Sequence, residues 1–327
     1  MILKGGLIGF GYWGPVLLKN FSAHKDIEIE AICDRNSSKL NTAQSLSPTS
    51  KTYKDADFIF SDPTIDFVII ATQAETHYDL IRKSLLSGKH VFVEKPFTLN
   101  SIQAEELVSK NRELNLLIMV DHTFLFTPQY EAIKKIICAN RLGKLLHFHS
   151  LRADFGLFQK DINILWHLMY HDIYILMDLF EQLIPISIKA SGSAHIVGPL
   201  EDTAMVSIKY PNGLNADIIN NMLFPRKERK IIIAGEKAIL LWDDTVPEHQ
   251  KLSLFNKNAS YDQETGKIEY SFGDSFETVE VSKKQALENQ VEYFVACLKE
   301  GNKPQNNEVA ALQVMQLLES INNTMHA

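Results

Sequence analysis

The chain has 327 residues, of which 45% are hydrophobic and 22% are charged, a balance typical of a folded protein rather than a disordered one. Its formal charge of −7 disfavours nucleic acid and anionic membrane as partners. No apolar run has the roughly 18–20 residues of a membrane-spanning helix. Because single cores stop growing near about 250–300 residues, the length predicts two domains.

The three cysteines, Cys33, Cys138 and Cys297, are odd in number and far apart. Their spacing matches neither a zinc site nor a redox pair, so we interpret each as a small buried apolar side chain. The opening MILKGGLIGF is too short, and too interrupted by glycine, for a secretory leader. We therefore expect a reducing, cytoplasmic location, with no membrane contact.

Residues 1–122 alternate short apolar runs with segments of helical periodicity. The predicted strands are Leu3–Ile8, Ile27–Cys33, Phe67–Ala71, His90–Val93 and Leu116–Val120. The predicted helices are Pro15–Phe21, Ser37–Leu46, Thr76–Ser87 and Ser101–Leu114. Strands that are apolar throughout are typical of a parallel sheet with helices on both faces. This part is predicted to be an α/β domain with a doubly wound parallel sheet.

Residues 123–327 show a different pattern. Three elements come first, a helix over Pro128–Ala139, a strand over Lys144–Ala153 and a long helix over Ile164–Glu181. Strand then follows strand across 186–281, with turn signals at 211–213 and 235–236. Two helices, over Gln285–Glu300 and Asn307–Asn323, come last. The pattern predicts an α+β domain with a large, mostly antiparallel sheet.

The first predicted strand runs directly into a glycine-rich turn and then a helix. The turn has the pattern GxGxxG and consists of Gly9, Phe10, Gly11, Tyr12, Trp13 and Gly14. The first glycine permits a tight turn, the second lets the backbone approach a pyrophosphate, and the third lets helix and strand pack closely. The N–H groups and dipole at the start of the helix attract the anion. This context predicts a dinucleotide-binding site.

An acidic residue, Asp34, follows the second predicted strand, about twenty positions beyond the glycines, as this motif requires. Its carboxylate can accept hydrogen bonds from the adenosine ribose and would repel a 2′-phosphate, so NAD is predicted in preference to NADP. The adjacent Arg35 weakens this preference, because a guanidinium can bind a phosphate or stack on adenine. Alternatively, Asp34 caps the helix that begins near Ser37.

The strand His90–Val93 leads into Glu94, Lys95 and Pro96. Ligands of such sheets bind at the carboxyl ends of the strands, so Lys95 lies on the functional edge. Its ammonium group can hydrogen-bond a substrate hydroxyl and stabilise the oxyanion that develops during oxidation. The alternative is a surface lysine paired with Glu94.

The long predicted helix carries two histidines, His167 and His171, which share one face. Tyr174 and Asp178 continue a polar stripe along an otherwise apolar helix, and we expect that stripe to face a cavity. Histidine suits proton transfer because its ordinary pKa lies near neutral pH. The alternatives are a pair of hydrogen-bonded interior histidines and a metal pair. Because no third ligand is identifiable, no metal is expected.

Together, these motifs resemble those of the Gfo/Idh/MocA oxidoreductases over nearly the whole chain. The shared residues are the glycine turn 9–14, Asp34, Ala71, Thr72, His77, Glu94, Lys95, Pro96, His171 and Asp172. The sequence is most similar to members that act on nucleotide-linked amino sugars. The resemblance implies a Rossmann domain, over residues 1–122, and a substrate-binding domain, over 123–327, whose open sheet face forms homodimers or homotetramers.

The resemblance also implies roles for individual residues. Lys95 and His171 are the expected catalytic pair, and His167 is a third candidate. Cofactor contacts are expected from the glycine turn and from Asp34, Arg35, Ala71, Thr72, His77, Glu94 and Lys95. Sugar contacts are expected from Lys95, Trp166, His167 and His171. One position departs from the family, because His167 stands where an aspartate is usual. Gln73, where proline or asparagine is common, is a lesser departure.

The predicted activity is hydride transfer between NAD and a hydroxyl or keto carbon of a sugar, with UDP-linked amino sugars as one candidate class. Two alternatives stay open. One is an enzyme that uses bound NAD transiently to cleave glycosidic bonds, and the other is a regulator that binds NAD and sugar without turnover. The charged run 226–230, RKERK, could meet a substrate pyrophosphate or could be a solvated strand edge.

Overall fold

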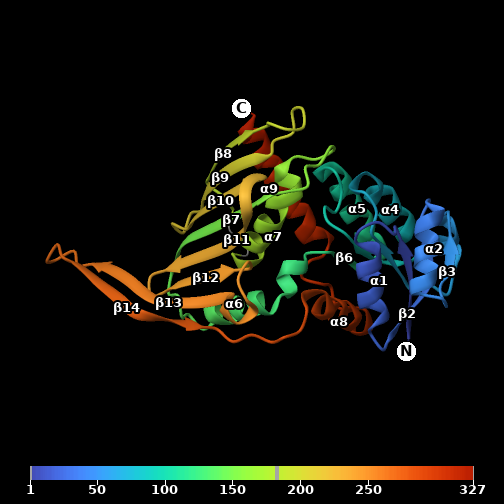
Figure 1. Cartoon of the computed structure of the whole chain (residues 1–327), viewed down its shortest axis with the longest axis horizontal. Helices are drawn as coiled ribbons and strands as arrows, with labels where there is room; N and C mark the ends of the chain where they lie inside the picture. Colours follow the sequence, from blue (N-terminus) through green and yellow to red (C-terminus); the bar gives the residue numbers. More distant parts are fainter. Residues whose placement is uncertain (1, 181–183, 327) are drawn as a thin grey trace. The chain divides into compact units, whose positions relative to one another are not determined.

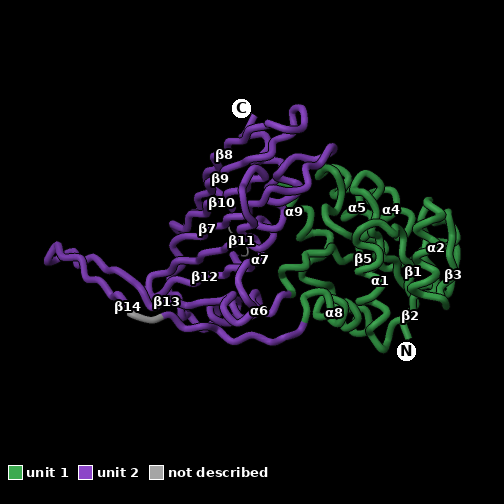
Figure 2. The backbone as a smooth tube through the Cα atoms, in the orientation of Figure 1, with its two compact units in different colours: residues 1–126, 285–316 green, residues 127–284, 317–327 purple. Residues whose placement is uncertain are grey.

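The computed structural model describes residues 2–180 and 184–326. The chain divides into two compact units (Figure 2). Unit 1 comprises residues 1–126 and 285–316, and unit 2 comprises residues 127–284 and 317–327. The predicted domain boundary between residues 122 and 123 stays a prediction. It counted residues 285–316 with the second domain, whereas this segment belongs to unit 1.

Within its described residues, unit 1 has a six-stranded sheet in the order β3-β2-β1-β4-β5-β6 (Figure 1). The strands are β1 (Leu3–Ile8), β2 (Ile27–Cys33), β3 (Lys51–Tyr53), β4 (Phe67–Ile70), β5 (His90–Val93) and β6 (Ile118–Val120). Neighbouring strands pair in parallel. The order places β1 beside β4 at the switch point where such sheets bind ligands. The predicted doubly wound parallel sheet is confirmed.

Helices connect these strands and cover the sheet. They are α1 (Gly14–Ser22), α2 (Ser37–Leu46), α3 (Asp57–Ser61), α4 (His77–Leu86), α5 (Ser101–Leu114) and α8 (Ala286–Glu300), with 3₁₀ turns at Ala74–Thr76 and Thr123–Phe126. All four residues of β4 are buried, as expected for a strand covered on both faces. The sequence does not predict β3 and α3, because three and five residues are too few to establish a period.

Helix α8 contributes residues from late in the sequence to the core of unit 1. The ring of Phe294 lies against those of Phe67 and Phe92, with centroids 5.2 and 5.7 Å apart. Phe21 of α1 completes the cluster, and all four side chains are fully buried. Because aromatic side chains bury large apolar areas, unit 1 needs this late segment to complete its core.

Within its described residues, unit 2 has an eight-stranded sheet in the order β14-β13-β12-β11-β7-β10-β9-β8 (Figure 1). The strands are β7 (Leu145–Phe155), β8 (Ser187–Ser193), β9 (Thr203–Lys209), β10 (Asn215–Asn221), β11 (Leu223–Gly235), β12 (Ile239–Asp243), β13 (Leu252–Tyr261) and β14 (Ile268–Thr278). Strands β7 and β10 pair in parallel, and the other pairs are antiparallel. The predicted large, mostly antiparallel sheet is confirmed.

One face of this sheet is covered and the other is more open. The helical elements of unit 2 are α6 (Pro128–Cys138), a π-helical segment (Leu165–Met169), α7 (Tyr170–Leu179), a 3₁₀ turn (Glu248–Gln250) and α9 (Glu308–Met325), which continues from unit 1. Helix α7 packs on the face that carries Ser150, whose hydroxyl donates to Asp172 at 2.8 Å. In β9 the buried Val206 and Ile208 alternate with the exposed Met205, so the opposite face is the open one.

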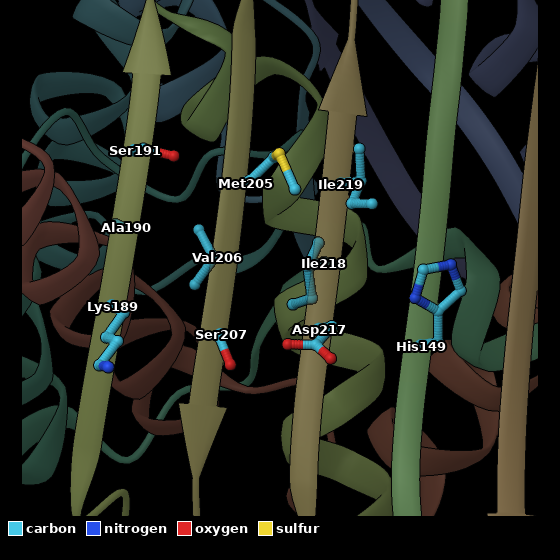
Figure 3. A pocket seen from close by; sticks show the side chains of 10 residues that line it. All are labelled: His149, Lys189, Ala190, Ser191, Met205, Val206, Ser207, Asp217, Ile218 and Ile219. Atoms are coloured by element: carbon cyan, nitrogen blue, oxygen red, sulfur yellow. The ribbon is translucent and has the colours of Figure 1, made fainter.

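The open face carries a groove (Figure 3). The groove is lined by His149, Lys189, Ala190, Ser191, Met205, Val206, Ser207, Asp217, Ile218 and Ile219. The hairpin of β13 and β14 extends this sheet outward (Figure 1). Cross-strand pairs place the exposed apolar side chains near its tip on one face, namely Tyr261, Ile268, Tyr270 and Phe272. Phe276, beyond an irregularity in the pairing, is exposed as well.

Some predictions need correction or refinement. Cys33 and Cys297 are buried as predicted, but Cys138, at the end of α6, is exposed. The long helix predicted over Ile164–Glu181 is a π-helical segment followed by α7, and its predicted last residue, Glu181, lies outside the described residues. Among the described helices, none is both long and apolar enough to cross a membrane.

Candidate functional site

The glycine turn after β1 has the geometry that its sequence predicts. Gly9 has a φ of 97°, and a Cβ there would lie 2.5 Å from the carbonyl oxygen of Ala71. A Cβ on Gly14 would lie 2.5 Å from the carbonyl oxygen of Gly9, so this glycine lets helix and strand pack closely. A Cβ on Gly11 would meet only Lys39 Nζ, at 3.9 Å. The open space beside Gly11 is where a ligand can approach the backbone.

The non-glycine residues of the turn differ in what they can offer a ligand. The Phe10 side chain is buried in the core of unit 1, so only its backbone belongs to the turn. Tyr12 and Trp13 are exposed, and their rings contact each other edge to face at 5.5 Å. Trp13 is the N-cap of α1, and no side chain caps the helix. The first amides of α1 therefore keep their capacity for an anion.

Asp34 holds the backbone around the turn. Its Oδ2 accepts a hydrogen bond from the Phe10 amide at 2.7 Å, and its Oδ1 accepts one from the Asn36 amide at 2.8 Å. The N-cap of α2 is Asn36, whose side chain accepts from the Ser38 amide, so the interpretation of Asp34 as a helix cap is wrong. Arg35 is exposed beside it. A carboxylate held by two amides is preorganised to accept further donors.

The ends of β4 and β5 are joined through His77, which is almost fully buried. Its Nδ1 lies 2.8 Å from the carbonyl oxygen of Pro96, and its Nε2 lies 3.2 Å from that of Thr72. Burial lowers the pKa of His77 in spite of these two acceptors, so the ring is neutral at neutral pH. The shorter contact assigns its single N–H to Nδ1. Both contacts of the His77 ring are to backbone carbonyl oxygens, so His77 connects the two strand ends through the backbone. Ala71, directly after β4, is buried.

Glu94 and Lys95 follow β5 directly, and the Lys95–Pro96 peptide bond is cis. Lys95 is half-buried, whereas the Glu94 side chain is buried. Burial raises the pKa of Glu94 well above its ordinary value, the neighbouring Asp121 carboxyl raises it further, and Lys95 opposes both effects. Lys95 therefore does interact with Glu94, as the alternative expects, but Lys95 is half-buried and that glutamate is buried, so this is not an ordinary surface ion pair.

The two histidines lie in different kinds of helix. His167 is inside the π-helical segment, and its amide donates to the carbonyl oxygen of Asn163 at 3.1 Å. His171 is in α7, and its Nδ1 lies 3.1 Å from the hydroxyl oxygen of Tyr174. Both rings are half-buried, as is Trp166. Single π turns are frequent at functional sites, and periodicity alone does not reveal them.

The prediction that the polar stripe of this helix faces a cavity is wrong at Asp178, the last residue of the stripe. Asp178 accepts a hydrogen bond from the hydroxyl of Tyr130 and lies 3.0 Å from Lys134 Nζ, both on α6. Tyr174 is nearly fully buried against His171. The stripe therefore packs against a neighbouring helix at Asp178 rather than facing a cavity.

A buried network beside His171 escaped the sequence analysis. Asp172 is fully buried and accepts hydrogen bonds from Ser150 Oγ at 2.8 Å, Asn220 Nδ2 at 3.0 Å and Arg152 Nη2 at 3.2 Å. A signal for it exists, because Ser150, Arg152 and Asn220 are polar residues at positions whose alternation points to the covered face. The network fixes the start of α7, and with it His171, on the sheet.

The charged run 226–230 forms ion pairs within the sheet. Glu228, which is buried, accepts from Arg226 Nε and Lys230 Nζ, each at 2.6 Å, and Arg229 Nη1 lies 2.9 Å from Asp244. Glu228, Arg229 and Lys230 pair with β7, so this part of the run is not a solvated strand edge, whereas Arg226 and Lys227 are exposed. Contact with a substrate pyrophosphate stays a prediction.

In the described ranges, no three metal-binding side chains gather, and the groove of Figure 3 contains none of the predicted site residues.

Comparison with known proteins places these features in a family. Residues 3–122 match the model of the Gfo/Idh/MocA oxidoreductases with an NAD-binding Rossmann fold. Residues 134–326 match the model of the C-terminal α/β domain of the same oxidoreductases. The chain belongs to the Gfo/Idh/MocA family. The predicted Rossmann domain, NAD as the cofactor and the class of NAD(P)-dependent oxidoreductase are thereby confirmed.

Individual relatives differ in what their names say they do. The chain is 25% identical to the inositol 2-dehydrogenase/D-chiro-inositol 3-dehydrogenase of Lactiplantibacillus plantarum, over 73% of this chain and 71% of that protein. It is also 25% identical to the 2,7-anhydro-N-acetylneuraminate hydratase of Escherichia coli, over 74% and 68%. The structure of UDP-N-acetylglucosamine 3-dehydrogenase from Acidithiobacillus ferrooxidans shares the fold, with a TM-score of 0.84, 20% identity and coverage of 99% and 97%.

The residues of this Gfo/Idh/MocA protein fit the NAD that its family model implies. The open space beside Gly11 and the uncapped amides of α1 suit a pyrophosphate. The carboxylate of Asp34 is held at the end of β2, where a ribose would find acceptors. The individual contacts and the catalytic roles of Lys95, His167 and His171 stay predictions.

Proposed function

We propose that the protein transfers a hydride between NAD and a hydroxyl or keto carbon of a sugar, and that nucleotide-linked amino sugars are its substrate class. The observation that carries the proposal is the fit of the glycine turn, with its open Gly11 and anchored Asp34, to a dinucleotide. The relative named as an inositol dehydrogenase supports the redox reaction at a carbon that carries a hydroxyl. The UDP-N-acetylglucosamine 3-dehydrogenase of the same fold supports the substrate class.

In this proposal the chain's own residues orient the substrate and move the proton. The NAD, when bound, supplies the two-electron redox capacity. The Lys95 ammonium donates a hydrogen bond to the reacting oxygen and stabilises negative charge there. His171 exchanges the hydroxyl proton, and the contact between its Nδ1 and the Tyr174 hydroxyl helps to orient the ring. The Asp172 network holds that histidine in one orientation.

The proposal is tested by assaying purified protein for NADH formation or consumption with a panel of polyols, sugars and UDP-sugars. A rate with UDP-amino sugars that exceeds the rate with the free sugars supports the substrate class. If only free polyols or sugars react, the substrate class is wrong and the redox reaction stands. If no compound changes the NADH signal, hydride transfer to a sugar is contradicted.

A second candidate has one observation in its favour, since the name of one relative denotes a hydration rather than an oxidation. In that case the protein would convert an anhydro sugar or a glycoside without net consumption of NAD. Product analysis by mass spectrometry separates the two. A product that differs from the substrate by water, formed without added NAD, favours the second candidate. A loss or gain of two hydrogens favours the first.

A further inference from the structure

A second carboxyl group lies beside Glu94 at the end of the neighbouring strand. Strands β5 and β6 pair in parallel with Val93 opposite Val120, so Glu94 and Asp121 both directly follow this pair. The Asp121 amide donates to the carbonyl oxygen of Val93 at 2.7 Å, which fixes the register. Residues in register on neighbouring parallel strands project to the same face of the sheet, so the two carboxyls are neighbours, and each acts on the pKa of the other. The sequence analysis gave Asp121 no role.

Two ionised carboxylates that are neighbours in a buried place repel each other, and neither can donate a hydrogen bond to the other, because both are acceptors only. One proton shared between Glu94 and Asp121 removes this repulsion. Both side chains are more than nine-tenths buried, which makes two charges costly. In addition, Oε1 of Glu94 is buried and has no hydrogen-bond partner among the described residues. Leaving a buried oxygen without a hydrogen bond costs less free energy when the carboxyl is protonated than when it is ionised.

The groups around this pair make Lys95 its counter-charge. Thr123 Oγ1 donates to Asp121 at 2.6 Å, and Gln290 of α8 lies beside the same carboxyl. Both are uncharged. The adjacent His122 is fully buried, and burial lowers its pKa to about 3, so it carries no charge at neutral pH. The ammonium of Lys95 acts on both carboxyls.

Next to this pair, His77 is neutral as well, and it reaches the same loop through the carbonyl oxygen of Pro96. With one shared proton, the two carboxyls carry a single negative charge, which balances the charge of Lys95. Burial is the main cause that raises the pKa of both acids, in agreement with a retained proton at neutral pH.

We propose that Asp121 is a positioning residue, which shares one proton with Glu94 so that the pair holds a single negative charge beside Lys95. The effect on turnover rests on the proposed function, because the charge of Lys95 affects turnover only if Lys95 is catalytic. The shared proton itself is a property of unit 1 and can be measured without any substrate.

The first experiment looks for the proton by infrared spectroscopy at pH 7. A protonated carboxyl has a carbonyl stretch that an ionised one lacks. We expect this band in the wild-type protein and its loss in Asp121→Asn and in Glu94→Gln, since the remaining carboxyl then has no second carboxyl beside it and ionises as the counter-charge of Lys95. Asp57→Asn, which removes an exposed carboxylate of unit 1, is the control and keeps the band. A wild-type spectrum without the band, or a band that survives both substitutions, overturns the proposal.

The pH dependence of stability gives a second readout that needs no activity. A group whose pKa is raised in the folded state stabilises the protein below its ordinary pKa, and that stability is lost as pH rises through the raised pKa. The wild-type melting temperature should therefore fall between the ordinary carboxyl range and neutral pH. Asp121→Asn should flatten this fall, and Asp57→Asn should not. Parallel curves for all three proteins contradict the proposal.

The third experiment measures turnover against pH. Each single variant keeps one negative charge beside Lys95, but Glu94→Gln with Asp121→Asn keeps none. We expect the alkaline limit of kcat to move to lower pH in the double variant only, and Asp121→Glu to retain the wild-type profile. An equal shift in Asp121→Asn alone overturns the charge-balance argument. If the wild type shows no turnover, the proposed function fails, and the infrared and stability results still decide whether the proton is shared.

Discussion

The two sheets of this molecule differ in how many of their faces are covered. In unit 1 every residue of β4 is buried, because helices pack on both faces. In unit 2 the residues of β10 alternate between buried and half-buried, because α7 covers one face only. The first arrangement confines ligands to the edge where the strands end, and the second leaves a broad face available. The difference predicts that the cofactor binds at the edge of the first sheet and that self-association uses the open face of the second.

The largest effect is expected from breaking the doubly covered core. Phe294→Ala removes a fully buried ring that contacts Phe67 and Phe92, and such truncations cost about 3–5 kcal/mol. Chemical denaturation monitored by circular dichroism measures this loss. Phe272→Ala, which truncates an exposed ring of the hairpin, is the matched control and should change the free energy of unfolding little. Equal losses in both variants would contradict the assignment of Phe294 to the core.

The next effect concerns the edge of the covered sheet. Lys95→Met removes the ammonium but keeps a side chain of similar length, so turnover should fall by about 10²–10³-fold, as for other lost donors to a developing oxyanion. The affinity for NAD, measured by isothermal titration calorimetry, should stay within about twofold of wild type, since the pyrophosphate and ribose contacts are elsewhere. A variant with normal turnover would show that Lys95 has no catalytic role.

The open face provides the third test. The family resemblance predicts a homodimer or homotetramer, and Ile219 lies on the groove-bearing face (Figure 3). Ile219→Lys should therefore weaken self-association by at least about tenfold, because a charge would be buried in the interface. Light scattering over a concentration series measures it. Lys189→Ala serves as a polar control in the same groove. A wild-type protein that stays monomeric would contradict the predicted oligomer.

The smallest effect is expected at Asp34. Asp34→Ser removes the charge that repels a 2′-phosphate, so the preference for NAD over NADP should fall by about tenfold or less. NAD affinity should also drop, because one hydroxyl cannot accept from both the Phe10 and Asn36 amides. Asp34→Asn keeps an acceptor without the charge and should relax the preference in the same way. Unchanged ratios of kcat/KM for the two cofactors would show that Asp34 does not discriminate.

The sequence predicts the covered sheet better than the open one, for a physical reason. Strands β1, β2 and β5 are short segments rich in apolar residues, followed by Gly9, Asp34 and Glu94, and their predicted limits agree with the structure. The turn after β1 is equally predictable, because Gly9 and Gly14 are required by backbone conformation and close packing. These are local constraints, and short windows of sequence contain them.

Other features depend on contacts between distant segments. Asp172 is satisfied by residues of β7 and β10, and Asp121 meets Glu94 only because β5 and β6 are neighbours. The π turn at His167 replaces one backbone hydrogen-bond pattern with another and leaves the apolar periodicity nearly unchanged. The amphipathic pattern of α8 indicates that one face is buried but not that it joins unit 1.

The late position of α8 has a consequence for synthesis on the ribosome. Strands β1 to β6 are translated first, but Phe294 joins their core only after the whole of residues 127–284 has been made. Until then the nascent sheet exposes Phe67 and Phe92, which makes it a target for chaperones and prone to aggregation. The nucleotide-binding half therefore matures late although it is encoded first, and a cell acquires a finished cofactor site only when nearly the entire polypeptide has emerged.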